Sequence, residues 1–191
     1  MKKIFILMGN PDVESTNGRL ADAYERGAKN GGHEVRRMNL GEMKFDPILH
    51  RGYKVRQELE PDLIAVQENI KWADHFVLIY PSWWSGMPGP LKGMFDRMWL
   101  PGFAFNFSPG KLLWKMLLKG KTARVIVTSD TNPLINRFMF GDSTGIIQRG
   151  ILWFSGIFPV YITRIGGMKS ITEEKRLRWI GRIERKGGMG R

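Results

Sequence analysis

Short, uninterrupted apolar runs recur along this chain, and segments with apolar residues at helical spacing lie between them. The runs predict strands at Lys3–Met8, near His33–Leu40, and at His75–Tyr80, Thr122–Thr128 and Pro159–Ile165. Such runs are typical of strands buried on both faces, which occur in parallel sheets covered by helices. The alternation of strand and helix therefore predicts a three-layer α/β fold, in which helices cover both faces of a five-stranded parallel sheet.

Helix signals fill the segments between these strands. The first predicted helix starts at the N-cap candidates Ser15, Thr16 and Asn17 and stops at Gly31-Gly32, and the second starts at Pro61. Two more cover Pro88–Trp99 and Gly145–Phe154. The last runs from a capping box at Ser170 and Glu173 to about Arg185. No repeat, low-complexity tract or linker interrupts this pattern. We therefore expect a single domain over residues 1–191.

The chain contains no cysteine, which excludes disulfides, thiolate metal sites and dithiol redox chemistry. If electrons move through this protein, a bound cofactor must carry them. The apolar run Ile4–Met8 at the N-terminus is shorter than the roughly 7–15 residues of a signal-peptide core. No stretch approaches the roughly 20 apolar residues of a membrane-spanning helix. We therefore expect a cytoplasmic protein.

The formal net charge is +12, and half of it lies between Arg164 and Arg191, where nine Lys or Arg residues face three acids. A basic surface attracts nucleic acid, anionic lipid headgroups or phosphorylated small molecules. Apart from Trp179 this segment has no interleaved aromatic residues, so it is a poor platform for stacking nucleic-acid bases. We favour a solvated face on an enzyme without nucleic acid, and peripheral contact with a membrane stays open.

The residues that follow the first predicted strand suit a phosphate. Gly9–Gly18 leads into a helix, whose free N–H groups attract anions, and Ser15, Thr16 and Asn17 add side-chain donors. Ordinary helix capping uses the same residue types, so this segment alone does not decide between the two interpretations. The segment lacks the glycine spacing of a Rossmann fingerprint and of a P-loop, which argues against both.

Two further predicted strands end in loops of unusual composition. Pro81–Pro88 carries the adjacent Trp83 and Trp84, which need a flat ligand, a core or a dimer interface to cover them. Thr128–Pro133 gathers small hydrogen-bonding residues that could read a polar ring edge or form a simple turn. In a sheet of order 2-1-3-4-5, all three loops would line one crevice at the carboxyl ends of the strands.

The segment Pro81–Arg97, followed by Gly102-Phe103-Ala104-Phe105, resembles the NAD(P)H:quinone oxidoreductases of flavodoxin-like fold. Their pattern there runs P-x-x-W/Y-x-x-x-P-x-x-L-K-G-x-x-D/E-R and then G-x-A-Y/F. The resemblance extends from the first strand to about Ile165. It implies a flavin, either FAD or FMN, with NAD(P)H as co-substrate and a quinone or similar small molecule as electron acceptor. It also implies a homodimer with sites at the interface.

The resemblance also implies which residues contact the flavin. They are Asn10, Thr16 and Asn17 at the phosphate, Ser82, Trp83, Trp84 and Ser85 beside the isoalloxazine ring, and Thr128, Ser129, Asp130 and Thr131 in the third loop. With Ser15 and Pro81 from the same loops, these residues form the candidate cofactor site. We expect no metal.

The chain departs from the family pattern in three places. Asn10 stands where the family usually has histidine, and Asp130-Thr131 replaces paired glycines, so we expect a different approach to the ring. The Tyr and His that better-known members carry after the third loop are absent, and Phe138 and Phe140 lie there instead. We therefore assign no catalytic acid or base.

The function predicted from the sequence is electron transfer from NAD(P)H to a quinone or similar acceptor through a bound flavin. The alternative is a flavin-binding soluble regulatory subunit of a membrane ion transporter. The three histidines, His33, His50 and His75, lie outside the three loops, and we expect His75 to be structural.

An aromatic run supports the expected homodimer. Leu100, Phe103, Phe105 and Phe107 have no obvious strand or helix to bury them within one chain. An exposed apolar patch of this kind usually marks an interface.

Overall fold

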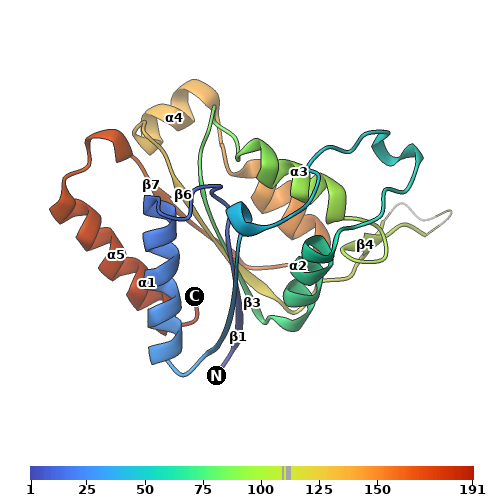
Figure 1. Ribbon diagram of the computed structural model, residues 1–191, viewed down its shortest axis with the longest axis horizontal. Helices are drawn as coiled ribbons and strands as arrows, with labels where there is room; N and C mark the ends of the chain where they lie inside the picture. Colours follow the sequence, from blue (N-terminus) through green and yellow to red (C-terminus); the bar gives the residue numbers. More distant parts are fainter. Residues whose placement is uncertain (109, 111–112) are drawn as a thin grey trace.

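A five-stranded parallel sheet of order β2-β1-β3-β6-β7 forms the centre of the computed structural model, which describes residues 1–108, 110 and 113–191 (Figure 1). Its strands are β1 (Lys3–Met8), β2 (Glu34–Asn39), β3 (His75–Pro81), β6 (Thr122–Thr128) and β7 (Val160–Ile165). Numbered among themselves, these strands have the order 2-1-3-4-5, so the predicted topology is confirmed. The predicted strand positions agree with the observed ones to within one residue.

Helices cover both faces of this sheet (Figure 1). One face carries α1 (Thr16–Asn30) and α5 (Glu173–Gly188), and the other carries α2 (Pro61–Trp72) and α3 (Gly89–Met98). Alternate residues of β1 serve the two cores: Ile4, Ile6 and Met8 pack with the first helix pair, and Phe5 and Leu7 pack with the second. The fold is therefore the predicted three-layer flavodoxin-like arrangement.

Two glycines let α1 and α5 approach each other closely. A Cβ atom added to Gly27 would lie 1.9 Å from the carbonyl oxygen of Glu184. One added to Gly187 would lie 2.2 Å from the carbonyl oxygen of Tyr24. Backbone therefore packs on backbone at this crossing, which no larger residue permits.

Several predicted elements need correction. The helix predicted at Gly145–Phe154 is present, but as a π-helix at Ile146–Leu152 followed by a 3-10 turn at Trp153–Ser155. The expected capping box at Ser170 is wrong, because the side chain of Thr172 caps α5 by accepting from the Lys175 amide at 3.3 Å. The prediction also lacked α4 (Pro133–Phe140) and the short antiparallel strands β4 (Phe105–Asn106) and β5 (Lys115–Met116).

The aromatic run after α3 is only partly exposed. Phe103 is buried and meets the ring of Trp99 edge to face, with ring centroids 5.4 Å apart, so the expectation that it lacks a partner in this chain is wrong. Leu100 and Phe105 are half-buried. Phe107 is 67% exposed, as expected. The 3-10 turn after the π-helix holds the residue just before the run: the indole N–H of Trp99 donates to Ser155 Oγ at 2.6 Å.

His75 is the first residue of β3 and lies at the end of the sheet opposite α4, where its side chain is buried and neutral. Burial, together with the nearby charges of Lys2 and Arg124, lowers the pKa of His75 from 6.5 to about 3. One ring nitrogen contacts Thr122 Oγ1 at 2.6 Å. This edge is remote from the candidate loops, in line with a structural role for His75.

His75 predicts a loss of stability in acid. Between pH 6.5 and about 3 the unfolded chain gains a proton at His75 and the folded chain does not. The free energy of unfolding should therefore fall by about 1.4 kcal/mol per pH unit in this window from this group alone. Urea unfolding of the wild type and His75→Leu at a series of pH values measures the contribution. A variant with the same pH slope as the wild type would contradict it.

Candidate functional site

The three candidate loops lie together at the carboxyl edge of the sheet, since β1, β3 and β6 are neighbours. The Gly9 amide, at the start of the first loop, donates to Ile79 O of β3 at 2.7 Å. The Ser82 amide, in the second loop, donates to Thr128 O of β6 at 2.7 Å. Backbone hydrogen bonds thus join the ends of the three strands, and the loops flank one region of the surface.

A buried chain of polar side chains connects the first loop with the third. Asn10 Nδ2 donates to Asn17 Oδ1 at 3.2 Å, and Asn17 Nδ2 donates to Thr128 Oγ1 at 3.1 Å. Asn10 Oδ1 also accepts from the Asp12 amide at 3.0 Å. Asn10, Asn17 and Thr128 are each at least nine-tenths buried. They fix the shape of the loops, and their contact with a cofactor phosphate stays a prediction.

The N-terminus of α1 presents free amides between these loops. Ser15 is the N-cap, and its Oγ accepts from the Gly18 amide at 3.4 Å while donating to Asp12 O at 2.6 Å. Thr16 is the first helical residue and is half-buried. The first turn of α1 contains no acidic residue. The unpaired N–H groups and the partial positive charge of a helix start suit an anion here.

The tryptophan loop is a strained, tight turn. The backbones of Trp83 and Gly86 exchange two hydrogen bonds of 2.9 Å, and the residues between them, Trp84 and Ser85, have φ angles of +50° and +59°. Such turns normally use Asn or Gly, because other residues at positive φ cost free energy that the surroundings must offset. Pro81, the last residue of β3, and Ser82 lead into this turn.

The indole of Trp84 is fully exposed, and that of Trp83 is 47% exposed. The two tryptophans are therefore not covered by a core within this chain, which excludes one of the explanations that the sequence left open. The turn is held from one side: Ser85 Oγ donates to Oδ1 of Asn136, a buried residue of α4, at 3.0 Å. A flat ligand or a second protein surface remains to cover the two rings.

The third loop leads into α4. Ser129 is half-buried and its hydroxyl donates to Thr131 O at 2.8 Å, whereas Asp130 and Thr131 are exposed. Asn132 caps α4 by accepting from the Leu134 amide at 2.9 Å. The loop is thus both a polar surface and a helix cap.

Sequence reasoning missed a small cavity beneath α4. It has a volume of about 150 Å³, and its lining includes Ser82, Ser129, Asn136, Asp142 and Arg164. The Arg164 guanidinium donates to Asp142 Oδ1 at 2.9 Å. Burial alone would raise the pKa of Asp142, but hydrogen bonds from Thr144 and Arg164 hold it below its ordinary value. The signal in the sequence was an arginine near the end of the last predicted strand.

The site offers no obvious acid or base. His33, His50 and His75 all lie elsewhere, as expected: His33 contacts Gly188, and His50 pairs with Asp46 at 2.6 Å. Phe138 and Phe140, in place of the family's Tyr and His, are exposed on α4. Among residues 1–108, 110 and 113–191 no group of three or more His, Asp or Glu side chains is placed to hold a metal ion.

A second, larger hollow lies beside α3, on the other side of the molecule from α1. Its volume is about 1000 Å³, and it lies between the loop around Tyr53, α3, and the segment that carries Phe105 and Phe107. Phe107 is 67% exposed and Tyr53 72% exposed. The aromatic run was predicted from the sequence, but the hollow that it lines together with Tyr53 was not.

The fold and the arrangement of these loops define a flavodoxin-like α/β protein. The model of the family described as "Flavodoxin-like fold" matches residues 2–184, and the chain belongs to this family. The resemblance to the flavodoxin-like NAD(P)H:quinone oxidoreductases is also confirmed, by relatives in sequence and in structure.

Two curated relatives and two solved structures illustrate the likeness. The chain is 28% identical to rat NAD(P)H dehydrogenase [quinone] 1 over 185 residues, which cover 82% of this chain and 65% of the rat protein. It is 28% identical over 179 residues to an uncharacterized NAD(P)H oxidoreductase of Haemophilus influenzae, covering 90% of this chain and 87% of that one. The chain therefore spans just under two thirds of the rat protein.

The similar structures match over nearly their whole length. The structure of Smu.1420 from Streptococcus mutans UA159 has a TM-score of 0.86 and 27% identity, covering 98% of this chain and 99% of that one. The NAD(P)H:quinone oxidoreductase from Methanothermobacter marburgensis has a TM-score of 0.81 and 25% identity, covering 98% and 96%.

Proposed function

We propose that this chain is a flavin-dependent oxidoreductase that transfers electrons from NAD(P)H to a quinone or a similar small acceptor. The observation that carries the proposal is the fully exposed indole of Trp84, held on a strained turn at the sheet edge where α1 begins. An exposed ring on a held backbone turn, beside a helix whose first turn has no acid, suits a ligand with a planar ring system and a phosphate. The names of the relatives support the same reaction class.

The three loops would contact different parts of the flavin. The first-turn amides of α1, with Ser15 and Thr16, would hold the phosphate, and Asn10 and Asn17 would shape the loop behind it. Trp83 and Trp84, on the turn from Pro81 to Ser85, would flank the ring. The polar edge of the ring would meet Thr128, Ser129, Asp130 and Thr131.

The residues present fit such a cofactor chemically. The loops supply neutral donors and aromatic surface, and their exposed acids are Asp12 and Glu14 before α1 and Asp130 in the third loop. When bound, a flavin would supply the ability to accept a hydride from a nicotinamide and to pass electrons on in pairs. The chain's own part is to bind and orient the ring. The proposal covers either FAD or FMN, and either NADH or NADPH.

The alternative, a flavin-binding regulatory subunit of a membrane ion transporter, gains no support. The relatives with functional names described above are oxidoreductases. Among the described residues, no helix combines the length and the apolar character needed to cross a bilayer.

Replacement of Trp84 should weaken flavin binding. A stacked aromatic contributes about 0.5–1.5 kcal/mol beyond its buried area, so Trp84→Ala should raise the Kd about 2- to 12-fold. Titration of the flavin-free protein with FAD and FMN, followed by fluorescence, measures the effect. Trp153→Ala is the control, because Trp153 is 54% exposed and lies outside the three loops. Equal affinities for all three proteins would contradict the role of Trp84.

We further propose that the hollow beside α3 is filled by a second copy of the chain. Its exposed aromatic rim, with Phe107 and Tyr53, is a poor surface to leave in water. The wild type should sediment as a dimer at micromolar concentration, and Phe107→Ser should shift it toward monomer. Phe158→Ser is a matched control, since Phe158 is also 67% exposed but does not line the hollow. A monomeric wild type, or a dimer insensitive to the Phe107 change, would overturn the assignment.

A further inference from the structure

Tyr80 is a fully buried tyrosine near the end of β3, directly before the loop that carries the two tryptophans. Within the residues that the structure describes, its hydroxyl has no hydrogen-bond partner. The start of the first candidate loop packs against it, since a Cβ atom added to Gly9 would lie 3.3 Å from Tyr80 Cβ. A buried hydroxyl normally finds a partner, because leaving it unpaired costs free energy. The proton of this hydroxyl is therefore available to a group from outside the chain.

Tyr80 belongs to a row of residues that crosses three neighbouring strands. In the sheet register Tyr80 pairs with Val127 of β6, and Val127 pairs with Arg164 of β7. Residues paired across neighbouring strands point to the same face of the sheet. Tyr80 and Val127 both pack in the core beneath α2 and α3, which identifies that face. The long side chains of Tyr80 and Arg164 therefore flank the smaller Val127 on one face of the sheet.

The charged pair of Arg164 and Asp142 is close enough to act on the Tyr80 hydroxyl. Burial raises the pKa of Tyr80, and the smaller effects of Arg164 and Asp142 oppose each other, the first lowering the pKa and the second raising it. Arg164 donates to Asp142 Oδ1 at 2.9 Å. Because its pKa is raised, Tyr80 keeps its proton at neutral pH and serves as a hydrogen-bond donor.

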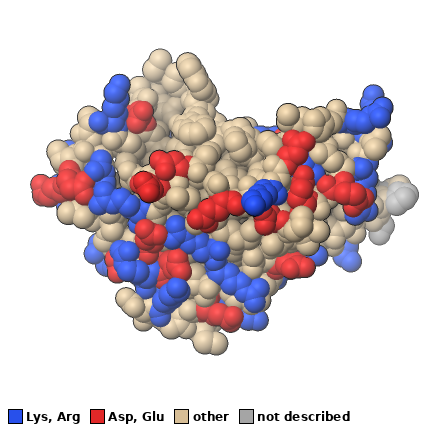
Figure 2. All heavy atoms as spheres, viewed as in Figure 1, with Lys and Arg blue, Asp and Glu red and all other residues tan. Residues whose placement is uncertain are grey.

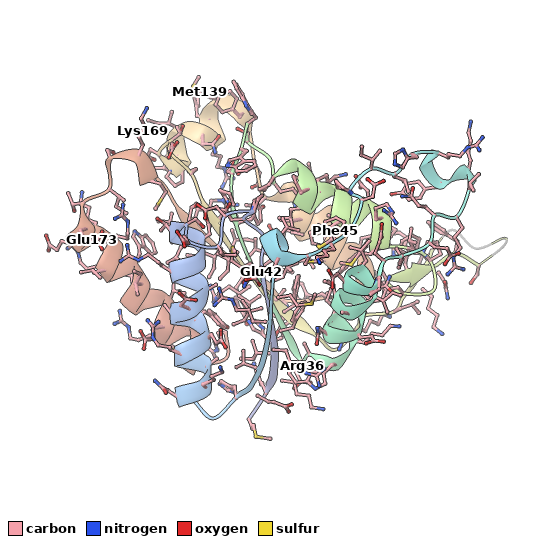
Figure 3. The ribbon with its side chains drawn as sticks, viewed as in Figure 1. Arg36, Glu42, Phe45, Met139, Lys169 and Glu173 are labelled. Carbon is pink, nitrogen blue, oxygen red and sulfur yellow. The ribbon has the colours of Figure 1, made fainter. Side chains whose placement is uncertain are left out.

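Helix α4 covers this edge of the sheet. Figure 3 places Met139 of α4 at the summit of the edge, and Figure 2 shows no charged side chain at that summit. The charges that act on Tyr80 thus come from the pair beneath the helix and not from its outer surface.

The cavity beneath α4 connects this row with the candidate loops. Val127 and Arg164 form part of its wall, and Ser82 and Ser129, from the second and third loops, form another part. Its volume of about 150 Å³ leaves room for a few water molecules or for the edge of a flat ring. The hydroxyl and charged groups of this wall suit a polar occupant. A polar group that enters between the second and third loops therefore comes next to the row that holds Tyr80.

We propose that the Tyr80 hydroxyl donates a hydrogen bond to the polar edge of the bound flavin ring, either directly or through one water molecule in the cavity beneath α4. This inference rests on the proposed function and adds a residue to the candidate site. The third loop would meet the same edge of the ring from the side, and Tyr80 would add a donor from the sheet itself.

Such a donor acts more strongly on the reduced cofactor. A flavin ring gains negative charge at its polar edge on reduction, and hydrogen bonds to charged acceptors are roughly twice as strong as those to neutral ones. Tyr80 would therefore stabilise the reduced flavin more than the oxidised one, which favours transfer of a hydride from the nicotinamide. The chain lacks the family's Tyr and His after the third loop, and Tyr80 is a donor that it offers at this edge.

Tyr80→Phe removes only the hydroxyl, and the proposal predicts opposite effects on the empty and the loaded protein. The Tm of the flavin-free protein should stay the same or rise, because the variant no longer buries an unpaired hydroxyl. The Kd for the oxidised flavin should rise about 2- to 12-fold, as expected for the loss of one hydrogen bond. Thermal unfolding and fluorescence titration of the flavin-free protein measure the two effects.

Tyr24→Phe is the matched control. Tyr24 is also fully buried, but its hydroxyl donates to Arg191 O at 3.1 Å, and it lies on α1 away from the three loops. This variant loses an existing hydrogen bond, so its Tm should fall by about 2–4 °C. Its flavin affinity should equal that of the wild type.

The midpoint potential of the bound flavin gives a readout that a purely structural role would not move. In Tyr80→Phe the affinity for the reduced flavin should fall about tenfold more than that for the oxidised flavin. For a two-electron couple this difference makes the potential about 30 mV more negative. The potential in Tyr24→Phe should not change.

The outcomes separate this inference from the proposed function. A wild type that binds neither FAD nor FMN would overturn both. If the wild type binds a flavin, a Tyr80→Phe protein with unchanged affinity and potential would overturn the role of Tyr80 alone. A Tyr80→Phe protein that loses thermal stability without flavin would also overturn it, because the hydroxyl would then support the fold rather than the cofactor.

Discussion

The buried hydrogen bond between Asn17 and Thr128 joins the start of α1 to the end of β6, and the arrangement of the candidate site depends on it. Parallel strands bring their carboxyl ends to one edge, but they do not fix how the loops beyond them lie. Here Asn10, Asn17 and Thr128 form one polar chain inside that edge. Because a buried polar group left without a partner costs about 1–3 kcal/mol, the three side chains hold one another, and thus the loops, in place.

The tight turn from Trp83 to Gly86 is a second part of the site, and its backbone is strained. Trp84 and Ser85 both adopt positive φ angles, although neither residue type favours them. The paired hydrogen bonds between Trp83 and Gly86 and the bond from Ser85 to Asn136 offset that strain. Strain that the surroundings enforce is concentrated at functional sites, where a fixed geometry matters more than local stability. The turn thus fixes the backbone from which the Trp84 indole projects into solvent, where a flat partner could cover it.

The sequence allowed the central sheet to be predicted well, because buried parallel strands are nearly continuous apolar runs. His75–Tyr80 and Thr122–Thr128 correspond to β3 and β6 almost residue for residue. The position of the three loops followed from strand order alone. The flavodoxin-like resemblance rested on the motif from Pro81 to Arg97, which spans the turn and α3.

What escaped prediction depends on tertiary contacts. Helix α4 was missed because its apolar residues face outward, although Asn132 followed by Pro133 is a recognisable helix start. Burial of Phe103 required the distant Ser155 segment, which binds Trp99 from fifty-six residues away. The roles of Asn136 and Arg164 arise only when α4 folds over the sheet edge.

The central claim is that the carboxyl edge of this sheet holds a flavin that NAD(P)H reduces. Anaerobic stopped-flow absorption of the flavin-loaded protein tests it most directly. On mixing with NADH or NADPH the visible flavin absorption should bleach, and it should return when a quinone is added. Because hydride transfer depends on orientation more than on a proton donor, the absence of the family's Tyr and His should not prevent the first step. A bound flavin that keeps its colour with both nicotinamides would contradict the account.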